Sequence, residues 1–148
     1  MILNRQSRIP LQAAGLARFL ASVRHELKLG RRELNVCFVD DREIARLNRR
    51  FRGKPKPTDV LSFPSNGTAE GNRAGDLSFA HDKRFLGDIA ISPRVARRNA
   101  KRFGRTLDEE LRVLMLHGVL HLMGYDHEAD SGEMEQLEAR LRTKLGLG

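Results

Sequence analysis

The side chains best suited to chemistry lie in one segment of this 148-residue chain, HGVLHLMGYDH at residues 117–127. His117 and His121 are four residues apart, which on an α-helix places both imidazoles on one face, one turn apart. Gly124 follows where a helix can end in a left-handed residue, so the chain would turn back and bring His127 toward the first two rings. Three neutral imidazoles with an open fourth position are typical of a catalytic zinc site, whereas structural sites are usually closed by cysteines.

The residue after the first histidine limits the chemistry of this site. The spacing matches the metzincin protease signature H-E-x-x-H-x-x-G-x-x-H, in which the glutamate is the general base. That position is Gly118 here. The pattern therefore predicts a metal site without the peptidase base. A chance cluster is the alternative, but three of the chain's five histidines fall within these eleven residues.

The metal ligands need a rigid helix, and the sequence indicates where this helix begins. Thr106 and Glu109 form a capping-box pattern, and Leu111, Val113 and Leu114 would anchor the helix in a core.

A basic helix precedes it. Ser92 and Pro93 are a favoured N-cap and first residue, and Gly104 follows the last residue, Phe103. Spacings of three and four place its basic residues on one broad surface, roughly opposite Val95, Ala96 and Phe103, which is either a solvated face or a surface for a nucleic-acid backbone. These residues are Arg94, Arg97, Arg98 and Lys101.

Another helix should begin at Asp40 and Glu43, with Ile44, Leu47 and Phe51 inside. The segment RGKPKPTD, residues 52–59, should be an extended loop because its prolines forbid helix. We expect this loop to present the basic side chains of Arg52, Lys54 and Lys56.

The remaining elements complete a single domain over residues 1–148. A first helix is expected over residues 10–27, strands over 34–40, 60–64 and 86–92, a loop over 65–74 and a brief strand over 77–80. A last helix, capped by Asp130 and Glu133, should turn apolar side chains inward and Glu135 and Glu138 outward. Strands mixed with four or five helices indicate an α/β or α+β fold, with helices packed on a small sheet.

Charge and composition narrow the functional classes. The net charge of +8 favours polyanionic partners, nucleic acid above all. No apolar run is long enough to span a bilayer, so we expect no membrane insertion. The start of the chain lacks a signal-peptide pattern and Cys37 is the only cysteine, which together predict a cytoplasmic protein.

Three segments together resemble the YbeY family, metal-dependent endoribonucleases that act as ribosomal RNA maturation factors. They are NRRFRGKPKPTDVLSFP at residues 48–64, LGDIAIS at 86–92 and HGVLHLMGYDH, and they occur in the family's order. The resemblance implies one α/β domain with a small, mixed, mostly parallel sheet. It also implies one Zn²⁺ per chain held by His117, His121 and His127, and a functionally critical arginine at Arg52.

The resemblance further implies a single-strand-specific enzyme that processes the 3′ end of 16S rRNA and takes part in ribosome quality control. Attack by water and attack by the RNA 2′-hydroxyl both remain open, and in either route Arg52 would grip the charged phosphorane. Asp126 is either a partner of a metal ligand or an ordinary turn residue. The chain has no evident aromatic platform for stacking bases, so target choice would come from RNA shape or from the ribosome or its proteins. Two alternatives remain: a ribosome-assembly binding protein with a structural zinc, and a metal-dependent hydrolase of another substrate.

Overall fold

A four-stranded mixed sheet forms the centre of the computed structural model, which describes residues 1–65, 84–126 and 130–147. The strands are β1 (Ile2–Asn4), β2 (Glu33–Phe38), β3 (Val60–Pro64) and β4 (Phe85–Ile91), in the order β1-β2-β4-β3. β1, β2 and β4 are parallel, and β3 runs antiparallel to β4 at the edge. The small, mostly parallel sheet expected from the sequence is therefore confirmed.

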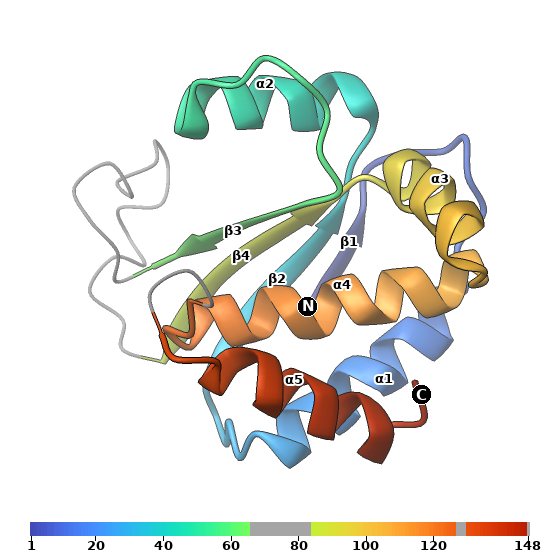
Figure 1. Cartoon of the computed structure of the whole chain (residues 1–148). Helices are drawn as coiled ribbons and strands as arrows, with labels where there is room; N and C mark the ends of the chain where they lie inside the picture. The colour runs from blue at the N-terminus through green and yellow to red at the C-terminus, as the bar shows by residue number, and fades with distance from the viewer. Residues whose placement is uncertain (66–83, 127–129, 148) are drawn as a thin grey trace.

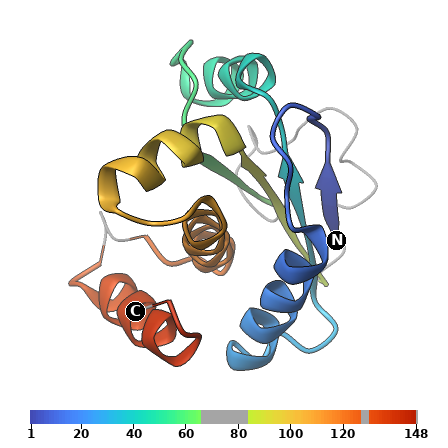
Figure 2. The same ribbon diagram turned by 90° about the vertical axis from the view of Figure 1, so that its right-hand side faces the viewer.

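Helices cover both faces of the sheet (Figures 1 and 2). α2 (Asp41–Arg52) lies over one face, whereas α1 (Ala13–Glu26) and α4 (Leu107–Leu122) pack on the other. α3 (Pro93–Phe103) crosses near the end where β4 finishes, and α5 (Glu133–Lys144) packs outside α4. None of the described helices is long and apolar enough to cross a membrane.

α4 is the central helix, buried between the sheet and α5 (Figure 2). Its Leu111, Met115, Leu116 and Leu120 are almost fully buried in the main core, together with residues of α1, β2 and β4. Gly118 lies directly against β4, where a Cβ atom would be 2.9 Å from both Cδ1 and Cγ2 of Ile89. Only a residue without a side chain permits this close approach of helix and sheet.

The helix ends follow the expected local signals in most cases. Thr106 Oγ1 accepts a hydrogen bond from the Glu109 amide (3.1 Å), and Glu109 Oε1 accepts one from the Thr106 amide (2.8 Å), which completes the capping box of α4. Ser92 caps α3 as predicted, and Gly104 ends that helix with φ +69°. At the start of α2, Asp40 accepts a hydrogen bond from the Glu43 amide. The Glu43 side chain instead lies 3.3 Å from Arg46, so only half of that expected box forms.

The end of α2 and the start of α5 differ from the expected positions. Arg52 belongs to the last turn of α2 and not to the loop, because the helix continues until Gly53 adopts φ +71°. Gly132 is the N-cap of α5, although the Asp130 carboxylate still accepts hydrogen bonds from the amides of Gly132 and Met134. The expected strand at residues 77–80 lies outside the described residues, as does nearly all of the expected loop at 65–74.

Candidate metal and nucleic-acid site

The imidazoles of His117 and His121 face each other on the C-terminal half of α4. Their Nε2 atoms are 3.1 Å apart, and their ring centroids are 4.6 Å apart with the planes at 73°. Two tetrahedral Zn–N bonds of about 2.05 Å would place the nitrogen atoms roughly 3.3 Å apart. The pair therefore fits a shared metal ion, and the four-residue spacing in the sequence is what brings the two rings together.

Glu138 of α5 lies behind this pair. Its Oε1 is 2.8 Å from Nδ1 of His117, and both side chains are largely shielded, with 19% and 28% of their surface exposed. A carboxylate is an acceptor, so it places the proton of a neutral imidazole on Nδ1 and leaves the Nε2 lone pair directed at His121. This is the arrangement in which an outer carboxylate orients a histidine ligand for a metal ion.

The inward position of Glu138 corrects the sequence-based expectation that it would face outward. Met134, Glu138, Leu141 and Leu145 are separated by four, three and four residues, so they share one stripe of α5. The helical spacing alone predicts that Glu138 faces inward, whereas its charge favours an exposed position. A buried carboxylate needs a partner, and His117 provides one.

The pKa of Glu138 reflects two opposing effects. Burial of the carboxyl group disfavours the charged form and would raise its pKa. The hydrogen bond from His117, with the charges of His117, Arg142 and His121, outweighs burial and lowers the pKa below its ordinary value. Glu138 is therefore a carboxylate at neutral pH.

The backbone between the two histidines is attached to the sheet. Ser62 of β3 donates a hydrogen bond from Oγ to the Gly118 carbonyl oxygen at 3.4 Å. Within the described parts of the chain, no cluster of three His, Cys, Asp or Glu side chains could hold a metal ion. The expected third ligand, His127, lies outside the described residues. The two described histidines fit a metal ion, and the third ligand remains a prediction.

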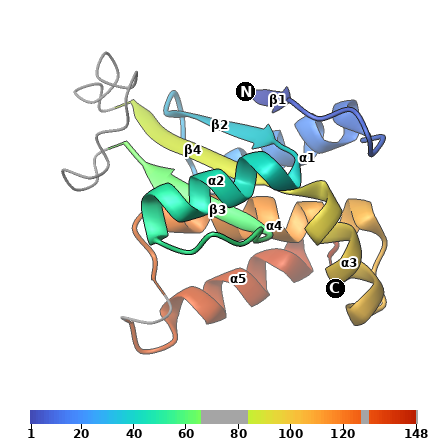
Figure 3. The same cartoon turned by 90° about the horizontal axis from the view of Figure 1, so that it is seen from above.

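Arg52 lies on the other side of the sheet from the histidines. The C-terminal ends of α2 and α4 point toward the same end of the sheet, on opposite faces (Figures 1 and 3). The Arg52 side chain is exposed, and no hydrogen bond or ion pair joins it to a histidine among the residues described. The loop that follows Arg52 is anchored by the buried Asn48, whose side-chain amide nitrogen donates a hydrogen bond to the Lys56 carbonyl at 2.9 Å.

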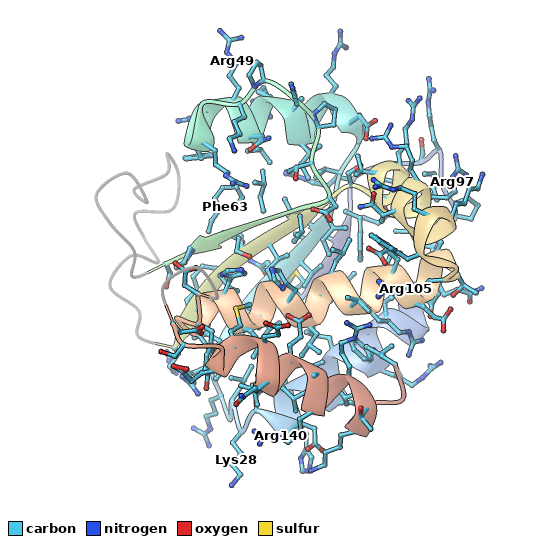
Figure 4. The ribbon with its side chains drawn as sticks, viewed as in Figure 1. Lys28, Arg49, Phe63, Arg97, Arg105 and Arg140 are labelled. Carbon is cyan, nitrogen blue, oxygen red and sulfur yellow. The ribbon has the colours of Figure 1, made fainter. Side chains whose placement is uncertain are left out.

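The basic helix has the predicted orientation except at its end, where Phe103, expected on the face opposite the basic residues, is 59% exposed. Val95, Ala96 and Ala100 of α3 are buried, and the opposite surface carries exposed cationic side chains (Figure 4). Those predicted for RNA binding are Arg94, Arg97, Arg98 and Lys101, and all four are exposed. Their role in binding RNA is not tested by their exposure.

Asp59 and Asp126 lie close to the segments that carry the expected site residues. Asp59 is structural, because its carboxylate accepts hydrogen bonds from the Val60 amide (2.8 Å) and from Asn99 (3.3 Å), which join the start of β3 to α3. Asp126 accepts a backbone hydrogen bond from Asp130 through its carbonyl group. Whether its carboxylate supports a metal ligand stays a prediction.

Comparisons with known proteins agree with the resemblance in the sequence. Residues 1–146 match a family model described as Endoribonuclease YbeY. An Endoribonuclease YbeY of Solibacter usitatus is 43% identical over 97% of this chain and 86% of its own length, and that of Koribacter versatilis is 44% identical over 99% and 86%. The solution structure of TM1509 from Thermotoga maritima has a TM-score of 0.64 and 28% identity, and the match covers 98% of this chain and 89% of that one.

Proposed function

The chain belongs to the endoribonuclease YbeY family, and from that premise we propose that it is a zinc-dependent, single-strand-specific endoribonuclease of ribosomal RNA. It would process the 3′ end of 16S rRNA and act in ribosome quality control in the cytoplasm. The substrate class, RNA, follows from the family. The observation that best supports a metal is the 3.1 Å separation of the two Nε2 atoms, with Glu138 bonded behind one ring.

One Zn²⁺ per chain would be held by His117, His121 and His127. When bound, the ion would supply Lewis-acid stabilisation at a phosphoryl oxygen and make a water molecule more acidic. Glu138 would keep the proton of His117 on Nδ1, so that the Nε2 lone pair is available as a ligand. The structural support for this assignment is the fit of two rings and the carboxylate behind them.

The identity of the nucleophile, water or the 2′-hydroxyl, is left open by the residues. Neither route needs a carboxylate at position 118, where Ile89 leaves no room for one. Both routes place extra negative charge on the phosphorus oxygens, and a guanidinium with two parallel donors can stabilise it. We assign this role to Arg52, which is exposed and is the last residue of α2, a helix that ends at the same end of the sheet as α4 (Figure 3).

The exposed face of α3 would hold the RNA backbone away from the chemistry. Arg94, Arg97, Arg98 and Lys101 supply charge without reading sequence, because contacts to phosphates position a strand but do not distinguish bases. The choice of cleavage site would then depend on RNA shape or on contacts with the ribosome or its proteins.

The metal assignment is tested by elemental analysis together with RNA cleavage, using chelator and zinc add-back. We expect His117→Ala to lose metal and cleavage together while the far-ultraviolet circular dichroism spectrum stays native. Full activity in a metal-free His117→Ala protein would contradict the catalytic role. Global unfolding of this variant would favour a structural zinc, and cleavage of casein in place of RNA would favour another hydrolase.

The role of Arg52 is tested by charge reversal with a matched control. Arg52→Glu should keep its zinc and lose cleavage. Arg49 lies in the same last turn of α2 and is also exposed, so Arg49→Glu makes the same change in net charge (Figure 4). Equal losses in both variants would show a general effect of charge and would remove the specific role of Arg52.

A further inference from the structure

A second basic site lies at the opposite end of the sheet from the histidines. The parallel strands β1, β2 and β4 finish at Asn4, Phe38 and Ile91, and a cavity of about 1120 Å³ opens beyond them. Five arginines from three separate elements line it, and we call it the arginine pocket. They are Arg5 and Arg8 of the N-terminal loop, Arg42 of α2, and Arg94 and Arg97 of α3.

The charge of the arginine pocket is positive after its acids are counted. The five arginines face two aspartates, Asp40 and Asp41, which leaves a formal excess of three positive charges. Both carboxylates already have partners. Asp40 accepts the Glu43 amide, and Asp41 accepts the Ser92 hydroxyl at 2.7 Å and lies 3.6 Å from Arg94.

Three of the five guanidinium groups have donors to spare. Arg94 pairs with Asp41, and Arg5 lies 3.9 Å from Glu43, so these two are partly neutralised. Arg8, Arg42 and Arg97 are exposed and make no side-chain hydrogen bond or ion pair with any described residue. A guanidinium presents paired donors that match the oxygens of a phosphate, so these three side chains are suited to bind one.

The loop that carries Arg8 is held in place before any ligand binds. The Gln6 side chain accepts a hydrogen bond from the Ile9 amide at 3.0 Å and donates to the Ile9 carbonyl and to Asn4. Ile9 itself is buried, and the Arg5 amide extends the pairing of β1 with β2 by donating to the Phe38 carbonyl. A pre-ordered loop reduces the entropy lost when a ligand binds.

We propose that the arginine pocket binds backbone phosphates of the RNA strand at a distance from the bond that is cleaved. The proposal rests on the proposed function, since it takes the RNA substrate as the ligand. Gly118, between the two histidines, lies against Ile89 of β4, and Pro93, four residues after Ile89, lines the pocket. At about 3.3 Å per residue of strand, the two places are roughly 10–15 Å apart.

The arginine pocket differs from the exposed face of α3. Arg98 and Lys101 lie on that face but do not line the pocket, whereas Arg8 lines the pocket but is far from α3 in the sequence. A phosphate site built by three elements requires Arg8 as well as Arg97. If only the exposed face of α3 bound RNA, replacing Arg8 would leave RNA binding unchanged.

The test compares Arg8→Gln, Arg97→Gln and the double variant with Arg140→Gln. Arg140 is exposed on α5, has no side-chain partner among the described residues and lies on the other side of the molecule from Arg97 (Figure 4). Binding of a single-stranded RNA is measured by fluorescence anisotropy over a range of salt concentrations, and a gel of the same samples checks that the RNA is intact. Each lost phosphate contact should make the plot of log association constant against log salt less steep, reducing the magnitude of its slope by about 0.7.

We expect the double variant to reduce the magnitude of the slope by about 1.4 and to raise KM for a long RNA. Arg140→Gln should behave as the wild type in both measurements. An unchanged slope in Arg8→Gln, or an equal change in Arg140→Gln, would overturn the proposal. If the slopes change as expected but RNA is never cleaved, the phosphate site stands and the proposed nuclease activity fails.

Discussion

Gly118, between the two histidines, should be intolerant of even one methyl group. In Gly118→Ala the new Cβ would lie 2.9 Å from two atoms of Ile89 and 3.2 Å from a third, against 3.4 Å or more in ordinary contacts. Ile89 is fully buried, pairs on one side with Val36 and on the other with Ser62, and has a stiff, β-branched side chain. Neither the side chain nor the strand can move aside easily.

The size of the effect follows from two opposing contributions. Overpacking a core by one methyl group costs about 1–3 kcal/mol, and three contacts with one immobile side chain place this case at about 2–3 kcal/mol. Alanine is a better helix former than glycine by about 1 kcal/mol. We therefore expect Gly118→Ala to lower the free energy of unfolding by about 1–2 kcal/mol.

Urea denaturation followed by circular dichroism measures this change, and Gly15→Ala is the matched control. Gly15 is also inside a helix, α1, but its Cβ would meet the flexible end of Arg112 at 3.3 Å. The control should be stabilising by up to about 1 kcal/mol from helix propensity, reduced by the cost of shifting the Arg112 guanidinium, which pairs with Asp108. In an Ile89→Ala background the clash is absent, so Gly118→Ala should become stabilising too.

A clash with Ile89 is refuted if Gly118→Ala is as stabilising as Gly15→Ala. It is also refuted if Gly118→Ala changes the free energy of unfolding equally with and without the Ile89 side chain. The same geometry has a consequence for the chemistry. A glutamate at position 118 would point at the sheet and displace α4, so Gly118→Glu should lower zinc affinity and should not create peptidase activity.

Three further predictions concern single side chains. Glu138→Gln should weaken zinc binding about tenfold, measured by competition with a chromogenic chelator, because it removes the charge behind His117; an equal loss in the exposed Glu135→Gln would contradict this. Thr106→Ala should lower the free energy of unfolding by about 1 kcal/mol in urea, through loss of the N-cap, and an unchanged value would mean that the capping box adds nothing. Burial raises the pKa of the Cys37 thiol, and the Asp88 carboxylate adds to this effect. Less thiolate therefore exists at pH 8, and a thiol reagent should react more slowly with the native protein than with the protein in urea. Equal reaction rates would contradict this prediction.

The sequence predicted the parts of the site that local signals determine. The four-residue spacing of His117 and His121, the capping box at Thr106 and the glycine after α3 each depend on a few neighbouring residues. Such signals act within one or two turns of helix, and the structure confirms them. The alternation along β2, in which Leu34, Val36 and Phe38 are buried, is a local pattern of the same kind.

Features that depend on distant partners could not be predicted in this way. β1 has only three residues, too few for an alternating pattern, and it exists because Ile2 to Asn4 pair with β2. The arginine pocket needs the ends of three strands to lie side by side, which no local pattern reveals. The charge of Glu138 alone predicts an outward side chain, and only the fold shows that His117 lies opposite it.

The distribution of charge indicates how RNA would approach the histidines. Among the described residues, the first turn of α5 carries Glu133 and Glu135, and Glu138 lies against His117, so the α5 side of the two histidines is acidic. Phosphates are repelled there and attracted to the α2 side, where Arg52 and the exposed Lys54 lie. A strand approaching over β3 from the α2 side would therefore meet the histidines with cations on one side and carboxylates on the other. This asymmetry favours the α2 side of the two histidines for RNA, and it leaves Glu138 on the α5 side to orient His117.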